Sequence, residues 1–167
     1  QEGTYPLPEA QLDRFIFNIW IDYPTEEEER AIVKSTTGLS EVDISPILDG
    51  KEVLALQSLV RKVPVSDEVV DYAVRLVRKT RPEGASSGST ENNNGVGELV
   101  SWGAGPRASQ SLILAAKARS VLEGRYAASV EDVNAMAIPV LRHRIVTNFN
   151  AEAQGIGPTD VIDRLIG

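Results

Sequence analysis

The sequence contains no cysteine and a single histidine, His143. Disulfide bonds and thiolate metal sites are therefore excluded, and so is a metal site with several histidine ligands. Aromatic residues make up 5% of the chain, and no apolar run reaches the length of a membrane-spanning helix. We therefore predict no metal site, no insertion into a membrane and a cytoplasmic location.

Positive charge is also scarce. The 167 residues include 17 Lys and Arg against 24 Asp and Glu, which gives a formal net charge of -7. A chain with this balance is not expected to bind nucleic acid or an anionic membrane nonspecifically. The hydrophobic fraction of 42% is enough for a core, and the length suits one ordinary domain with room for a fragment of another.

Helix signals dominate the rest of the sequence. Thr25 and Glu28 form a capping-box pattern, which predicts a helix that ends near Gly38. Ser129 caps a later helix through a capping box that has Asp132 in place of glutamate, and Pro139 is expected to kink or restart that helix. Caps, prolines and apolar spacing together predict helices over residues 9–14, 26–36, 51–61, 67–81, 106–124, 130–138, 141–149 and 158–166. We expect two apolar stripes to lie in the core, namely Val53, Leu56, Leu59 and Val60 in one helix and Val69, Ala73, Leu76 and Val77 in the next.

Three segments depart from the helical pattern. Residues 15–21, Phe-Ile-Phe-Asn-Ile-Trp-Ile, predict a buried strand. One strand is not stable alone, so it must pair with strands from elsewhere or pack against the helices. Residues 83–98 are rich in Gly, Ser and Asn and predict a flexible surface loop. Residues 99–102 are either a short strand or an anchor before the glycines that follow.

The stretch Gly103-Ala104-Gly105-Pro106-Arg107-Ala108-Ser109 precedes a long run of helix formers. Pro106 suits the first turn of that helix, because its missing N–H would have no partner there. Arg107 then lies at a helix N-terminus, where free N–H groups and the dipole favour anions. Two interpretations follow from the residues alone: a phosphate-sensing arginine, or a helix start with a solvated arginine.

The order of several motifs resembles that of the MoxR-type AAA+ ATPases. Residues 3–15, Gly-Thr-Tyr-Pro-Leu-Pro-Glu-Ala-Gln-Leu-Asp-Arg-Phe, are similar to the segment that follows sensor 1 in this family, and Asp22-Tyr23-Pro24 is similar to its passage into the lid. Further stretches match the family's lid in the same order: Val63-Pro64-Val65-Ser66, Thr80-Arg81-Pro82, Gly105-Pro106-Arg107-Ala108-Ser109, Glu131-Asp132-Val133 and Val140-Leu141-Arg142-His143-Arg144. The resemblance covers nearly the whole chain.

This resemblance implies a mainly α fold, the helical bundle lid of an AAA+ ATPase, preceded by one strand that belongs to the α/β nucleotide-binding core. Residues 1–24 would be the remnant of that core, and residues 25–167 the helical lid with its flexible loop at 83–98. No stretch matches the P-loop pattern G-x-x-x-x-G-K-[ST]. The P-loop, the Walker B acidic pair and the sensor 1 asparagine are expected before Gln1, so we predict that this chain alone does not hydrolyse ATP.

The resemblance also implies roles for individual residues. Arg107 matches sensor 2, which reaches the γ-phosphate bound by its own subunit, and Pro106 belongs to the same nucleotide-binding turn. Arg14 matches the arginine finger that reaches a neighbour's nucleotide, with a salt bridge to Asp13 or Glu9 as the alternative. Gly105 replaces a serine found in many relatives. The cluster at residues 142–144 is interpreted as a solvated helix end or partner surface, with no site assigned to it.

The implied function is that of a regulatory lid. In the full-length protein it would couple the binding and hydrolysis of ATP, with Mg²⁺, to chaperone-like remodelling or maturation of client proteins. The family implies a homo-oligomeric ring, which we expect to be hexameric, and we expect no tight binding of nucleotide to this chain alone. The alternative is a free-standing helical protein-interaction module with no nucleotide role.

Overall fold

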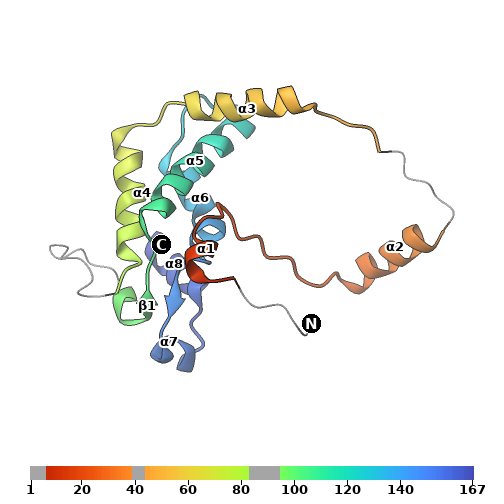
Figure 1. The fold of residues 1–167 in the computed structure, drawn as a ribbon. Helices are drawn as coiled ribbons and strands as arrows, with labels where there is room; N and C mark the ends of the chain where they lie inside the picture. The colour runs from red at the N-terminus through yellow and green to blue at the C-terminus, as the bar shows by residue number, and fades with distance from the viewer. Residues whose placement is uncertain (1–6, 39–43, 83–94) are drawn as a thin grey trace.

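The chain folds into helices and one short two-stranded sheet (Figure 1). The computed structural model describes residues 7–38, 44–82 and 95–167. In chain order the elements are α1 (Glu9–Leu12), α2 (Glu26–Thr37), α3 (Gly50–Lys62), α4 (Asp67–Lys79), the 3₁₀ helix η1 (Val96–Glu98), β1 (Val100–Trp102), α5 (Pro106–Leu122), α6 (Val130–Leu141), β2 (Val146–Thr147), α7 (Phe149–Ala153) and α8 (Pro158–Ile166). The prediction of a mainly helical chain is confirmed.

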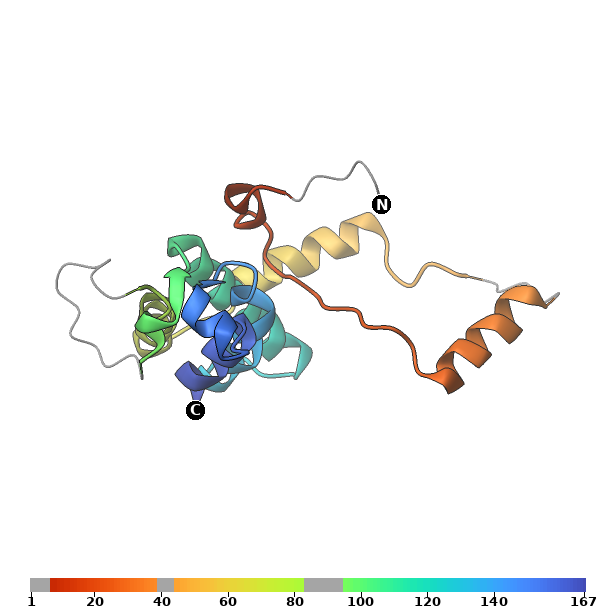
Figure 2. The ribbon, with the colours of Figure 1, turned by 90° about the horizontal axis from the view of Figure 1, so that it is seen from below.

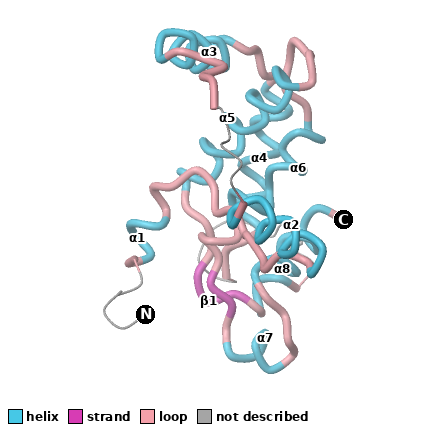
Figure 3. Tube along the Cα trace, turned by 90° about the vertical axis from the view of Figure 1, so that its right-hand side faces the viewer, coloured by secondary structure: helices cyan, strands magenta, loops and turns pink. Residues whose placement is uncertain are grey.

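The hydrophobic core lies among α4, α5, α6 and α8, with the small sheet at one end of the bundle (Figures 1 and 3). The predicted stripe of α4 is buried as expected, and Leu112 and Ala116 of the central helix α5 are fully enclosed. Val133, Ala137 and Val140 face this core from α6. Burial of these side chains supplies most of the stability of the bundle, because tertiary packing of an apolar face stabilises helices more than their intrinsic propensity does.

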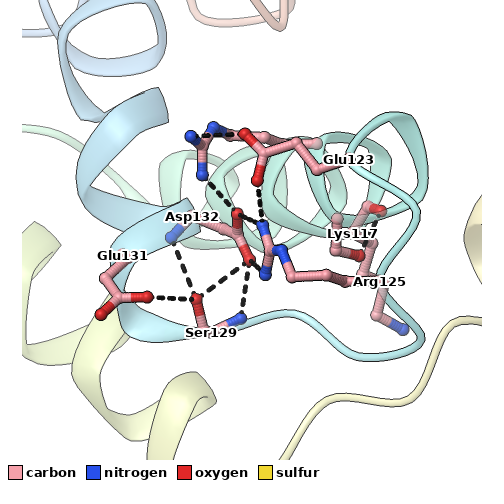
Figure 4. Close-up of polar contacts among 8 residues, drawn as sticks. Lys117, Glu123, Arg125, Ser129, Glu131 and Asp132 are labelled. Atoms are coloured by element: carbon pink, nitrogen blue, oxygen red, sulfur yellow. Dashed lines mark hydrogen bonds and ion pairs between the residues drawn. The ribbon is translucent and has the colours of Figure 1, made fainter.

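A buried ion cluster joins the end of α5 to the start of α6 (Figure 4). The fully buried Asp132 closes the predicted capping box with Ser129 and accepts hydrogen bonds from Arg119 Nη1 at 2.6 Å and Arg125 Nη1 at 2.7 Å. Hydrogen bonds from Arg125, from the Ser129 backbone and from Arg119 hold the pKa of the Asp132 carboxyl well below its usual range, against the opposing effect of burial. The cluster fixes the two helices relative to each other.

Neither α2 nor α3 carries a buried residue. The capping box of α2 forms as predicted, but this helix lies apart from the bundle (Figure 2). The predicted burial of the α3 stripe is wrong, because Val53, Leu56 and Leu59 are 41%, 45% and 47% exposed. α3 contacts α5, but this contact leaves the three side chains largely exposed, so an apolar stripe alone did not settle its burial.

The predicted strand at residues 15–21 is absent from the structure. The segment runs as an extended chain from α1 towards α2 (Figure 2), and its apolar side chains are exposed. A strand needs hydrogen-bonding neighbours. The sheet formed by β1 and β2 does not supply them, and the backbone N–H of Asn18 instead donates to the carbonyl oxygen of Pro139 at 2.8 Å.

The predicted helix at residues 141–149 is also wrong. α6 continues through Pro139 and ends at Leu141, and a turn over residues 142–144 leads into β2. β2 pairs antiparallel with β1, with Val100 opposite Thr147 and Trp102 opposite Val146. The β-branched side chains at residues 145–147 favour this pairing over a further helical turn.

The predicted flexible loop at residues 83–98 falls largely outside the described residues, which resume at Gly95. Its last part is ordered as η1, in which Val96 is fully buried in the core. Val96 anchors this end of the segment to the core, so the predicted loop ends before residue 96 and does not extend to residue 98.

Candidate functional site

The start of α5 presents Arg107 to solvent. Gly105 is the N-cap in an extended conformation, and Pro106 occupies the first turn as predicted. Ala108 is fully buried and fixes this turn to the core, whereas the Arg107 side chain is 55% exposed. The N-terminus of a helix carries a partial positive charge, and Arg107 adds a full positive charge beside it. An anion bound at this helix end would therefore be stabilised by both.

Thr80 and Arg81 hold the turn that precedes α5. The hydroxyl of the fully buried Thr80 donates to the carbonyl oxygen of Val77 at 2.7 Å and accepts from the N–H of Ala104 at 3.0 Å. Arg81 Nε donates to the Ala104 carbonyl oxygen at 3.3 Å. The backbones approach so closely that a Cβ at Gly103 would lie 2.4 Å from the Thr80 carbonyl oxygen. The Thr80-Arg81-Pro82 motif therefore positions the helix that carries Arg107, a role that the sequence did not indicate.

Arg14 and Arg107 border the same hollow. It has a volume of about 280 Å³ and is lined by Asp13, Arg14, Arg107, Gln110, Ser111 and Leu114. Arg14 follows α1 and is exposed. The predicted alternative for Arg14, a salt bridge to Asp13 or Glu9, is not seen among the residues that the structure describes. The structure thus brings together the two arginines that the resemblance singled out.

Asp13 lies between two arginines, neither of which is Arg14. Its Oδ1 accepts from Arg144 Nε at 3.0 Å, and its Oδ2 lies 3.8 Å from Arg107 Nη1. The Arg144 side chain is 2% exposed, whereas Arg107 is largely in solvent. The pair with Arg144 is therefore the fixed one, and the pair with Arg107 is a loose surface contact.

The cluster at residues 142–144 is not a solvated helix end, so the first of the two interpretations of it is wrong. Arg142 Nε donates to the carbonyl oxygen of Asn18 at 3.0 Å, and its guanidinium lies 5.7 Å from the ring centre of Trp20. His143 Nε2 lies 3.1 Å from the carbonyl oxygen of Phe15. Together with Arg144, these side chains attach the extended N-terminal segment to the end of α6.

Burial perturbs two of these basic groups. Burial lowers the pKa of His143, and the nearby Arg144 adds to this effect while the Phe15 carbonyl and Asp13 oppose it. A carbonyl can only accept, so Nε2 carries the proton in this contact, and the buried Nδ1 has no partner within the described residues. Burial likewise lowers the pKa of Arg144, with Asp13 opposing, but an arginine remains charged at neutral pH.

The chemistry of the hollow suits a polyanion. Two guanidinium groups present forked donors of the kind that bind phosphate oxygens. Pro106 has no N–H, so it can contribute only through the shape of the turn. Within the described ranges, no group of three or more His, Asp or Glu side chains could hold a metal ion, and no helix there is long and apolar enough to cross a membrane.

Comparison with known proteins identifies the helical part of this chain. Residues 94–165 match the AAA lid domain. This range contains the start of α5, the ion cluster around Asp132 and the basic residues 142–144. The match therefore includes Arg107, whereas Arg14 lies outside it.

Relatives extend the similarity to nearly the whole chain. Chaperone MoxR1 from Mycobacterium tuberculosis is 40% identical over 166 residues, which cover 99% of this chain and 42% of that protein. Protein MoxR from Paracoccus denitrificans is 32% identical over 152 residues, which cover 87% of this chain and 44% of that protein. A crystal structure from Cytophaga hutchinsonii, of a protein assigned as an ATPase, superposes with a TM-score of 0.87 at 31% identity and covers 99% of this chain and 49% of that one. The chain thus spans less than half the length of these proteins, and over nearly all of its own length it matches a part of a MoxR-type AAA+ ATPase.

Proposed function

We propose that this chain couples ATP binding and hydrolysis to movement of the lid in a longer MoxR-type protein. Residues 1–24 would be the end of the nucleotide-binding core, and residues 25–167 the lid domain. The observation that carries the proposal is the hollow shared by Arg14 and Arg107. Both guanidinium groups are exposed there, at the start of a helix whose dipole favours an anion.

The two arginines would act on phosphoryl charge in different ways. Arg107 would reach the γ-phosphate of ATP bound with Mg²⁺ by its own subunit, as sensor 2. Arg14 would reach the nucleotide of a neighbouring subunit, as an arginine finger. Charge on the transferring phosphoryl group must be stabilised by positioned cations, which is the chemistry that a guanidinium supplies.

The assembly and its clients follow from the same proposal. A finger that acts on a neighbour requires a ring, and we propose a homo-hexamer. One relative is named a chaperone, which supports a chaperone-like role in remodelling or maturing partner proteins. The P-loop and the magnesium ligands would come from other parts of the longer protein.

Alanine substitutions in the longer protein test this function. Arg107→Ala and Arg14→Ala should each lower ATP turnover by roughly tenfold to a thousandfold, because each removes a cation from the phosphoryl group. Arg30→Ala is the control, since Arg30 is exposed on α2 and lies outside the hollow. Turnover that is unchanged in both test variants would favour a helical interaction module with no nucleotide role.

A further inference from the structure

The end of α6 offers free backbone acceptors that the N-terminal segment uses. The last carbonyl groups of a helix have no partner within the helix. The carbonyl oxygen of Pro139 accepts from the N–H of Asn18, and that of Val140 accepts from Arg144 Nη1. The helix end therefore both receives the segment and orients the arginine that holds it.

Arg144 joins three parts of the chain that are distant in sequence. Besides Asp13 Oδ1 and the Val140 carbonyl, its guanidinium donates to Phe15 O at 2.6 Å, Asp13 O at 3.0 Å, Ile16 O at 3.4 Å and Ser111 Oγ at 3.4 Å. Ser111 lies on α5 one helical turn after Arg107. The planar fork of an arginine can satisfy such a set of acceptors, whereas the point charge of a lysine cannot.

Asp13, to which Arg144 is hydrogen-bonded, lies next to both exposed arginines. Asp13 precedes Arg14 in the chain and lies 3.8 Å from Arg107. If Asp13 and the backbone of residues 13–16 were free to move, Arg14 would not be held at the hollow and Arg107 would lose its neighbouring carboxylate. Displacement of a catalytic group by about 1 Å can cost a hundredfold in rate, so the position of this segment bears on the reaction.

We infer that Arg144 is a positioning residue, which holds Asp13 and residues 13–16 against α5 so that Arg14 and Arg107 face one hollow. It acts through Asp13 and the backbone and does not touch the nucleotide itself. This inference rests on the function proposed above for the two arginines. A purely structural arginine would instead stabilise the whole bundle without any selective effect on residues 13–18.

Amide exchange in the 167-residue chain separates these two roles. In Arg144→Lys, exchange should accelerate by about tenfold to a hundredfold at Asp13, Phe15 and Asn18, the change expected when hydrogen bonds to a charged group are lost. Amides of α5 and α6 in the core should keep their protection. Arg119→Lys is the matched control, because Arg119 is a partly buried arginine in the Asp132 cluster, away from residues 13–18. Equal exchange in Arg144→Lys and the unsubstituted chain, or acceleration spread equally over α5 and α6, would overturn the inference.

Asp13→Asn provides a second variant in case Arg144→Lys does not fold. The Asp13 side chain is 32% exposed, so this change removes the fixed ion pair without opening the core. It should accelerate exchange at the same amides, with a smaller factor, because the backbone acceptors of Arg144 remain. Unchanged exchange at Phe15 and Asn18 in this variant would contradict the role assigned to Asp13.

A double-mutant cycle in the longer protein tests the link to catalysis. Arg144→Lys should lower kcat for ATP by about tenfold alone and by clearly less in an Arg107→Ala background, because residues that act as a unit are not additive. Arg119→Lys should change kcat by the same factor in both backgrounds. An equal loss from Arg144→Lys in both backgrounds would make it a structural residue. If Arg107→Ala and Arg14→Ala both left turnover unchanged, the proposed function would fail and so would the catalytic part of this inference, while the exchange result would still show whether Arg144 holds the segment.

Discussion

Two glycines flank Ala104 and differ in what they permit at the start of α5. At Gly103 a Cβ would lie 2.4 Å from the carbonyl oxygen of Thr80 and 2.6 Å from the Cα of Arg81. Both of these atoms belong to the backbone, so neither can turn aside as a side chain would. At Gly105 a Cβ would meet no atom within 4 Å. The first glycine is therefore required by packing, and the second is not.

Gly103→Ala should lower the free energy of unfolding by about 1–3 kcal/mol, the usual range for overpacking. The added methyl group must push Thr80 and Arg81 away from the turn and weaken their hydrogen bonds to Ala104. Gly105→Ser is the control, and it should change stability by only a few tenths of a kcal/mol, since serine is an accepted N-cap residue. Urea denaturation of both variants checks this, and equal midpoints for the two would contradict the packing argument.

His143 should titrate below its ordinary pKa, because it is partly buried and its Nδ1 has no partner among the described residues. The unfolded chain then binds a proton at a higher pH than the folded chain does. The contribution of His143 to stability is therefore complete above an unfolded pKa of about 6.5 and declines as pH falls through the lower folded value. Titration of the His143 ring by NMR measures this directly, and a pKa at or above 6.5 would refute the assignment.

Among the helices and strands, local sequence signals correctly predicted those features that depend on contacts between residues close in the sequence. The capping boxes at Thr25 and Ser129, the proline at the start of α5 and the buried stripe of α4 formed as expected. The errors concern segments whose state depends on a distant partner. Residues 146 and 147 became a strand because β1 lies beside them, and residues 15–21 have no strand to pair with among the residues that the structure describes.

The candidate site was likewise predicted only in part: its residues could be named from local motifs, but their arrangement could not. Arg14 and Arg107 were singled out by motifs, but their common hollow could not be predicted, because more than ninety residues separate them. The contacts of Arg144 with residues 13–16 join positions that are 128 to 131 residues apart. A basic triplet at a helix end usually lies in solvent, and nothing in its spacing indicates that it binds the backbone of the N-terminal segment.

The junction of α5 and α6 offers a test of how firmly the two helices are joined. Asp132→Asn should destabilise the chain by about 1–3 kcal/mol, because it weakens charge-assisted hydrogen bonds to Arg119 and Arg125 and the capping box with Ser129. Glu123→Gln is the control. The Glu123 side chain is 43% exposed, so the loss should stay below about 1 kcal/mol. Thermal unfolding compares the two variants, and an equal effect of both would show that burial of Asp132 adds nothing.

In the molecule as a whole, the buried hydrophobic residues among those described come from the later part of the chain, whereas exposed apolar side chains occur both before Val63 and at positions after it such as Trp102 and Phe149. The buried hydrophobic residues run from Val63 onward, whereas residues 15–21 and the stripe of α3 are exposed. Residues 15–21 and the stripe of α3 thus present to solvent apolar side chains that suit a packed interface. In a longer protein that assembles into a ring, these surfaces would contact the nucleotide-binding core or a neighbouring subunit.

Mixed assemblies of the longer protein distinguish the two proposed roles, in which Arg107 acts within its own subunit and Arg14 acts on a neighbour. Each arginine variant is mixed with subunits that have a defective P-loop and intact arginines, and ATP turnover is measured after co-assembly is verified. Arg14→Ala subunits should regain activity, because a P-loop-defective neighbour can supply its intact Arg14 to their nucleotide. Arg107→Ala subunits should regain none, because Arg107 and the P-loop would both act on the nucleotide of their own subunit. In such a mixture every subunit lacks one of the two, and a neighbour cannot supply it. Recovery with neither variant, in rings shown to contain both subunits, would contradict the assignment of Arg14 as a finger, and recovery with Arg107→Ala would contradict its action within its own subunit.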